Sequence, residues 1–230
     1  MGRLLVTILV WGLLVATTVA FVATEALKLE RPLVSDLSRT RAFSPGCDCP
    51  KPSALVSFRL GRRAVLDVEV IDADDEAVRA LASGLREGRG RVRLEWDGRD
   101  DRGALVPDGE YRVRVRVEEE DREVTFGQPI VADRATPVVE LLAARPDELR
   151  AGAEVEIDFR VGETARVRLL GNGRRLAGLG RFQGGSRRAT WSTAGVPPGR
   201  YVLALSALDR AGNRSPASSS LTVRIAGSGE

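Results

Sequence analysis

The chain has 230 residues, no histidine and two cysteines, and this composition excludes several kinds of catalytic and metal site. Without histidine there is no Ser-His-Asp triad, no Cys-His pair and no imidazole ligand. Two cysteines alone hold neither a four-thiolate zinc site nor an iron–sulfur cluster. Basic residues outnumber acidic ones by 35 to 32, a net charge of +3 that gives only weak support for an anionic partner.

The first element in chain order is an uncharged apolar run from Leu4 to Ala23. A helix of about 20 residues spans the roughly 30 Å of a bilayer core. Arg3 precedes the run, so the positive-inside rule places the N-terminus in the cytoplasm and the rest of the chain outside. We expect residues 1–26 to form a single-pass anchor in the cell membrane. The alternative is a cleaved signal sequence, which would make the protein secreted.

Residues 27–53 come next and predict a stalk, because they contain four prolines and show no sustained hydrophobic period. The stalk carries the sequence Cys47-Asp48-Cys49. Outside the cytoplasm we expect both cysteines to be oxidised. A local disulfide within the stalk is the favoured interpretation, and a disulfide between two chains or a redox or metal role are the alternatives.

Apolar and polar residues alternate through the rest of the chain, which predicts strands with one buried and one exposed face. The alternating segments are 56–60, 66–70, 92–96, 111–117, 155–161, 167–169, 201–207 and 221–225. The segment from Asp75 to Leu85 fits either a short helix or an edge strand with a turn. Short strands separated by Gly, Pro and Asp turns are typical of a β-sandwich.

The second half of this region repeats the first. The matched positions are Phe58 with Phe159, Trp96 with Trp191, and Tyr111 with Tyr201. Each copy has about 90 residues, enough for a core of its own. We therefore predict two domains, 54–134 and 135–226, joined near Asp133–Pro137 and followed by a short tail at 227–230.

The most specific motif lies in the first copy and combines a Trp-Asp-Gly turn, an acidic loop with glycine, and a Pro-x-Gly-x-Tyr strand start. Its residues are Trp96, Asp97, Gly98, Asp100, Gly103, Pro107, Gly109 and Tyr111. Here the sequence resembles the Ig-like domain of the flagellar hook-capping protein family (FlgD-type), which occurs in many exported bacterial proteins. The resemblance covers residues 54–133 well. It covers 137–226 loosely, because the second copy keeps Trp191, Gly199 and Tyr201 without the Asp-Gly step.

The resemblance implies a β-sandwich without catalytic activity, and the chemistry of the motif residues agrees with it. Trp96 is large enough to fill a core. Tyr111 and Tyr201, each at a strand start, are expected to be tyrosine corners whose hydroxyl bonds to nearby backbone. We expect the acidic residues to stabilise turns through Asx-type hydrogen bonds. Binding of Ca²⁺ is the alternative for the aspartates at 97, 100, 101 and 108, although they lack EF-hand spacing.

Charge is distributed unequally between the two halves. Residues 54–134 carry 15 arginines and 19 acidic residues, a net charge of −4, whereas residues 135–230 carry 14 and 9, a net charge of +5. An ordinary solvated face is the favoured interpretation of these arginines. The alternative is a patch for an anionic ligand, with Arg174, Arg175, Arg187 and Arg188 as the candidate residues. Nucleic acid is not expected, because few aromatic residues lie among these arginines.

The sequence thus predicts an all-β protein with two tandem Ig-like sandwiches preceded by one transmembrane helix. We expect a membrane-anchored, extracytoplasmic and non-catalytic structural or interaction module of the bacterial cell envelope, without catalytic, cofactor-binding or metal-binding residues. Its expected partners are the membrane and an envelope protein or anionic polymer. The alternatives are a scaffold or accessory subunit for surface-polysaccharide or appendage assembly, and a carbohydrate-binding protein. The sequence does not indicate an oligomeric state.

Overall fold

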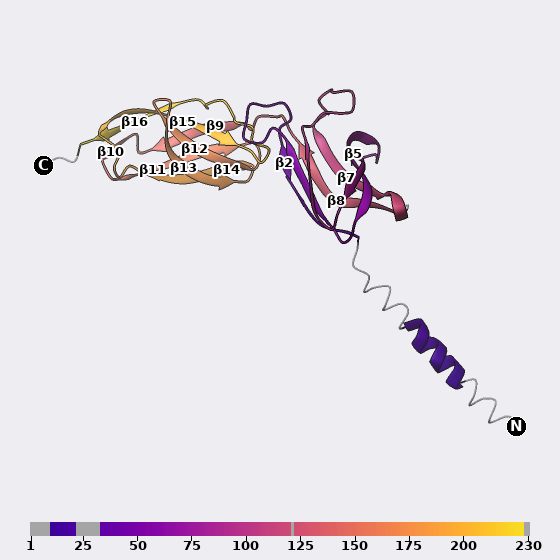
Figure 1. Ribbon diagram of the computed structural model, residues 1–230. Helices are drawn as coiled ribbons and strands as arrows, with labels where there is room; N and C mark the ends of the chain where they lie inside the picture. Colours follow the sequence, from indigo (N-terminus) through magenta and orange to yellow (C-terminus); the bar gives the residue numbers. More distant parts are fainter. Residues whose placement is uncertain (1–9, 22–32, 121, 228–230) are drawn as a thin grey trace.

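The computed structural model describes residues 10–21, 33–120 and 122–227, and it contains two β-sandwiches that follow one another end to end (Figure 1). Residues 10–21 are helical. None of the helical residues described forms a helix that is long and apolar enough to cross a bilayer. The parts of the expected anchor at 1–9 and 22–26 lie outside the described residues.

The first sandwich packs a three-stranded sheet against a five-stranded sheet. The three-stranded sheet has the order β1 (Val34–Arg39), β3 (Ala54–Leu60), β6 (Gly90–Trp96). The five-stranded sheet has the order β2 (Ala42–Phe43), β8 (Arg122–Ala132), β7 (Gly109–Val117), β4 (Ala64–Ile71), β5 (Ala77–Glu87). A 3₁₀ turn, η1 (Glu118–Glu120), follows β7. The segment 75–85 therefore belongs mainly to the edge strand β5 rather than to a helix.

The second sandwich has the same plan. Its three-stranded sheet has the order β14 (Gly185–Ser192), β11 (Glu154–Val161), β9 (Val139–Arg145). Its five-stranded sheet has the order β10 (Glu148–Arg150), β16 (Leu221–Ala226), β15 (Gly199–Leu208), β12 (Ala165–Gly171), β13 (Arg174–Phe182). In each domain the short second strand pairs in parallel with the last strand, and the remaining ladders are antiparallel.

This duplication corrects the stalk that we expected at 27–53. Residues 33–53 contain β1 and β2, which are the topological equivalents of β9 and β10, so they are part of the first sandwich. Val34 pairs with Leu60, and Ala42 pairs with Val131. The sequence pattern missed these strands because they are short and β1 contains an irregularity between Ser35 and Ser38. Residues 27–32 lie outside the described residues.

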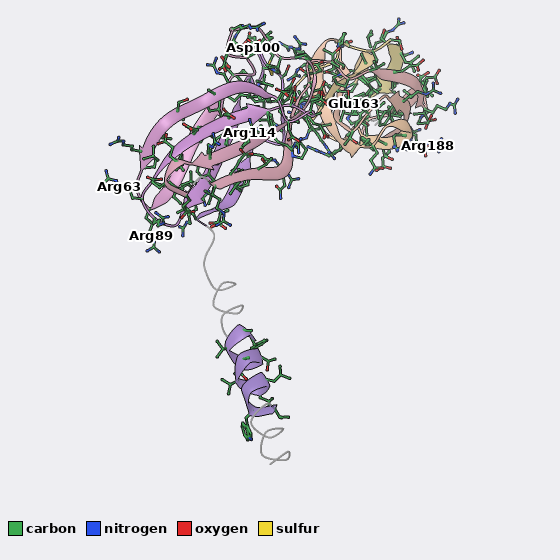
Figure 2. All side chains as sticks on the ribbon, turned by 90° about the vertical axis from the view of Figure 1, so that its right-hand side faces the viewer. Arg63, Arg89, Asp100, Arg114, Glu163 and Arg188 are labelled. Carbon is green, nitrogen blue, oxygen red and sulfur yellow. A yellow bond between two sulfur atoms is a disulfide. The ribbon has the colours of Figure 1, made fainter. Side chains whose placement is uncertain are left out.

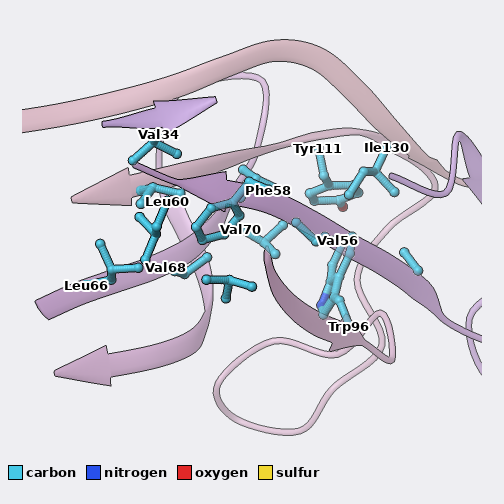
Figure 3. Close-up of a cluster of buried hydrophobic side chains, with 14 of the residues drawn as sticks. Val34, Val56, Phe58, Leu60, Leu66, Val68, Val70, Trp96, Tyr111 and Ile130 are labelled. Atoms are coloured by element: carbon cyan, nitrogen blue, oxygen red, sulfur yellow. The ribbon is translucent and has the colours of Figure 1, made fainter. Parts of the chain in front are cut away.

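Each sandwich has its own core, built from the inward-facing residues of the alternating strands. Phe58 and Phe159 occupy equivalent central positions and are fully buried. Figure 3 shows Val34, from the segment expected to be a stalk, beside Leu60 in the first core. Burying one such side chain is worth about 1.5–3 kcal/mol, so the two domains have independent hydrophobic stabilisation.

Candidate functional site

The Trp-Asp-Gly turn closes one end of the first sandwich. Trp96 is 1% exposed, and its ring contacts Tyr111 at a centroid distance of 5.1 Å and Phe43 at 5.3 Å. The indole Nε1–H donates to the backbone carbonyl of Arg99 at 3.0 Å, so its polar group is satisfied inside the core. In the second sandwich Trp191 is buried at the equivalent strand end. Both tryptophans lie in the cores, away from any binding surface.

The acidic residues of the motif are used to shape the loop. Asp97 accepts a hydrogen bond from the amide of Arg99, and Asp100 accepts from the amides of Arg102 and Ala104. Asp101 accepts from the amide of Ala80.

Asp108 forms an ion pair with Arg134 at 2.8 Å. Among the described residues, the aspartates of this loop do not converge into a group that could hold a metal ion. Figure 2 shows Asp100 in the loop that projects from the first sandwich.

The two Pro-x-x-x-Tyr segments have the geometry of tyrosine corners. The Tyr111 hydroxyl donates to the carbonyl of Pro107 at 2.8 Å, and the Tyr201 hydroxyl donates to that of Pro197 at 2.8 Å. Tyr111 is buried, and this burial raises the pKa of its hydroxyl. Gly109 and Gly199 start the strands β7 and β15 that carry these tyrosines. These residues hold the sandwiches together and leave no group free for chemistry.

The two cysteines lie at the junction between the sandwiches. Cys47 and Cys49 form a disulfide within one chain. A Cβ added at Gly212, in the second sandwich, would lie 3.5 Å from the Cys49 sulfur. Lys51, just after the disulfide loop, donates through Nζ to the carbonyl of Arg210 at 2.5 Å. The disulfide loop therefore packs against the Arg210–Gly212 turn of the second domain instead of lying in a free stalk.

A buried polar turn from Asp209 to Asn213 forms the other side of the junction. One Asp209 carboxylate oxygen accepts from the amides of Gly212 and Asn213, at 2.6 and 2.8 Å. The Asn213 side-chain amide donates both to Asp209 and, across the junction, to the carbonyl of Asp133 at 2.9 Å. The turn has the sequence Asp-Arg-Ala-Gly-Asn. Its role at the domain junction was not predicted.

Three carboxylates meet beside this turn: Asp133, Glu163 and Asp209, with oxygens within 4.8 Å of one another. Burial raises the pKa of Asp133, and the charge of Asp209 raises it further. Burial likewise raises the pKa of Glu163, with added repulsion from Asp209 and Asp133. These are the only described residues that form such a group, but the Asp209 oxygens already accept hydrogen bonds from backbone and Asn213. We interpret the group as a source of electrostatic repulsion at the junction.

The four arginines expected to form an anionic-ligand patch are divided between the two sheets. Arg174 and Arg175 begin β13, in the five-stranded sheet, whereas Arg187 and Arg188 lie on β14, in the three-stranded sheet. Arg187 donates to nearby backbone carbonyls, including that of Gly184 at 2.7 Å.

Arg188 is already paired with a carboxylate. It donates to Asp158 at 2.6 Å, and this hydrogen bond lowers the pKa of the Asp158 carboxyl. Figure 2 shows Arg188 at the outer surface of the second sandwich. The expected four-arginine patch is therefore not a single surface.

The fold and these turns define a class: an all-β protein of two tandem β-sandwiches. Residues 53–121, which include β3 to β7 and η1 of the first sandwich, match the family described as FlgD Ig-like domain. This confirms the resemblance drawn from the Trp-Asp-Gly motif. A comparison with curated proteins gives no match.

Solved structures of other two-domain β proteins resemble the chain at low identity. They include fibronectin(III)-like modules of Clostridium thermocellum CbhA, at 16% identity and a TM-score of 0.44, covering 86% of this chain and 93% of that one. Another is the human OSCAR ligand-binding domain, at 14% identity and a TM-score of 0.36, covering 84% and 97%. A third is the D0-D1 domain of Intimin, at 13% identity and a TM-score of 0.32, covering 84% and 99%. Similarity at this level adds nothing about ligands.

Proposed function

We propose that the protein is a non-catalytic interaction module of the bacterial cell envelope, held at the outer face of the cytoplasmic membrane by its N-terminal segment. The observation that carries this proposal is the bonded junction between the sandwiches. Asn213 and Lys51 each donate a hydrogen bond across it, so the two domains present their surfaces in a fixed relation. A module of this kind holds a partner in position and needs no catalytic activity.

Two further features support the location. The Cys47–Cys49 disulfide suits an oxidising compartment. The apolar run from Leu4 to Ala23 is long enough for an anchor and is preceded by Arg3.

The location is tested by adding protease to intact spheroplasts that carry the full chain with a C-terminal tag. We expect digestion of the tag without lysis, and retention of the chain in membranes washed with alkali. Protection of the tag until lysis would overturn the proposal. N-terminal sequencing separates the anchor from the secreted alternative, since a mature chain starting at Phe21 or Leu27 has lost the anchor.

The interaction role is tested by crosslinking in intact cells. Photoreactive residues replace Val202, an exposed position of the second sandwich, and Leu55, an exposed position of the first. We expect a reproducible envelope adduct at one of these positions. Adducts absent at both positions, with the tag still accessible to protease, would leave the location intact and refute the interaction role.

A further inference from the structure

The outward face of the five-stranded sheet in the second sandwich carries a group of arginines, of which the expected anionic-ligand patch included only Arg175. Arg166 and Arg168 are two residues apart on β12, so both project from this face, about 6.6–6.8 Å apart along the strand. Arg166 lies opposite Arg181 on β13 and opposite Leu208 on β15. Leu208 in turn bridges to Arg214. These four positions form a row across four neighbouring backbone segments, and three of the four carry arginine.

A glycine brings a further arginine onto the same face. Arg168 lies opposite Gly178 on β13. A Cβ at Gly178 would be 3.5 Å from Nη2 of Arg175, so the Arg175 side chain folds over the glycine toward Arg168. On the other side Arg168 faces Ser206, which is buried. We call Arg166, Arg168, Arg175, Arg181 and Arg214 the arginine face.

No acidic side chain neutralises the arginine face within the part of the chain that the structure describes. Arg168 Nε is buried there and has no hydrogen-bond partner. Burial lowers the pKa of Arg168, and the charges of Arg214, Arg175 and Arg166 lower it further. Four guanidinium groups are thus close enough to repel one another, and an anion is the ligand that would relieve that repulsion.

The equivalent face of the first sandwich shows that this arrangement is not a requirement of the fold. There β4 carries Glu69 at an outward position, and Glu69 forms an ion pair with Arg114 of the neighbouring strand at 2.8 Å. Asp67 stands at the position equivalent to Arg168, by the same offset that relates Phe58 to Phe159, and it accepts a hydrogen bond from the amide of Gly84. An outward arginine and an acidic residue of this sheet are therefore paired in the first sandwich, whereas the arginine face of the second sandwich has no acidic partner among the described residues.

We propose that the arginine face binds a linear polyanion whose charges are phosphate groups repeated along the chain. This rests on the proposed interaction role and gives it a ligand class. Each phosphate along such a chain keeps two unbridged oxygens in a tetrahedral arrangement, and these take bidentate hydrogen bonds from guanidinium groups. One large exposed apolar side chain, that of Val202 on β15, lies on the same sheet face, six residues from Leu208, the partner of Arg166.

The test is a titration of the full chain, in neutral detergent, with linear polyphosphate at several salt concentrations. The probe variant is Arg166→Gln/Arg168→Gln. The matched control is Arg145→Gln/Arg160→Gln, which removes the same charge from exposed positions of the other sheet. Emission of the buried Trp191, in matched versions where Trp11 and Trp96 are phenylalanine, checks that the second sandwich remains folded in both variants.

We expect salt-dependent binding by the wild type and a loss of at least about tenfold in affinity for the probe variant. The slope of log K against log salt should fall by about 1.4–1.8, because two contacts worth about 0.7–0.9 each are lost. The control variant should change affinity by less than about twofold, since exposed charges at a distance are screened.

Equal losses in the probe and control variants would show that only net charge matters and would overturn the assignment. Binding of polyglutamate as tight as that of polyphosphate would overturn the phosphate chemistry. Binding to vesicles of anionic phospholipid without binding to polyphosphate would replace the polymer with a lipid surface. Failure of polyphosphate binding in a chain that still gives an envelope crosslink would refute this inference while leaving the proposed function standing.

Discussion

Two glycines in the Trp-Asp-Gly loop give a sharp test of how segment 33–53 is attached to the first sandwich. Gly98 and Gly103 both have positive φ, +76° and +82°. A side chain in this region costs about 1–2 kcal/mol, so each change to alanine carries that penalty. A Cβ at Gly98 would also lie 2.3 Å from the Cβ of Pro45, whereas a Cβ at Gly103 has nothing within 4 Å.

The overlap with Pro45 should therefore separate the two variants. Overpacking typically costs about 1–3 kcal/mol in addition. We expect Gly98→Ala to lower the free energy of unfolding by about 2–5 kcal/mol and Gly103→Ala by about 1–2 kcal/mol. The shared backbone penalty cancels in the difference, which isolates the contacts of the added Cβ with Pro45 and with the Phe43 ring, 3.0 Å away.

The measurement is urea unfolding followed by the emission of Trp96, in a background where Trp11 and Trp191 are phenylalanine. Trp96 is buried beside Phe43, so its emission reports on the first sandwich. The background substitutions are common to both variants, and their cost cancels. Equal destabilisation by the two glycine changes would mean that the 42–47 segment moves away without cost, and it would refute its packing against the first domain.

Two more predictions concern the tyrosine corners and the acidic group at the junction. Tyr111→Phe should lower stability by about 1 kcal/mol, and Tyr201→Phe by less, because solvent reaches the half-exposed Tyr201 and can replace its partner; urea midpoints in which the Tyr201 change costs more would contradict this. The raised pKa values of Asp133 and Glu163 mean that the folded chain binds more protons than the unfolded chain, so their contribution to stability is lost as pH rises through the folded pKa. Glu163→Gln should therefore raise the urea midpoint near neutral pH and have less effect in acid; the same gain at both pH values would show that charge is not the cause.

The fold could be predicted from local patterns wherever a strand is long and alternates. The matched positions Phe58 and Phe159 led to the two sandwiches because both cores need a large residue at the same place. The stalk prediction was wrong for residues 33–53 because a strand as short as β2 has no period to detect. Its place is fixed by pairing with β8, almost 90 residues later, and by packing against the Trp96 loop.

The candidate site shows a similar limit. Motif chemistry indicated the turns around Asp97 and the corner at Tyr111, since those hydrogen bonds are local. It did not indicate the junction, where Asn213 reaches Asp133 across 80 residues of sequence. Nor did it identify Arg168, which the sequence shows only as one of many arginines on a strand. Whether a carboxylate lies near Arg168 depends on which strands lie beside β12, and this pairing is not visible in the sequence.

The arginine face should also lower the stability of the second sandwich by a measurable amount. This cost would link the unpaired charge to the binding of an anionic ligand. A buried donor without a partner and three like charges nearby both disfavour the folded state. Arg168→Gln removes the charge, so we expect it to raise the urea midpoint of the second sandwich while weakening polyphosphate binding. Arg188→Gln is the contrasting control, because it breaks the pair with Asp158 and should lower the midpoint. A lower midpoint for Arg168→Gln would mean that Arg168 stabilises the sheet, and the charge imbalance would then need no ligand to explain it.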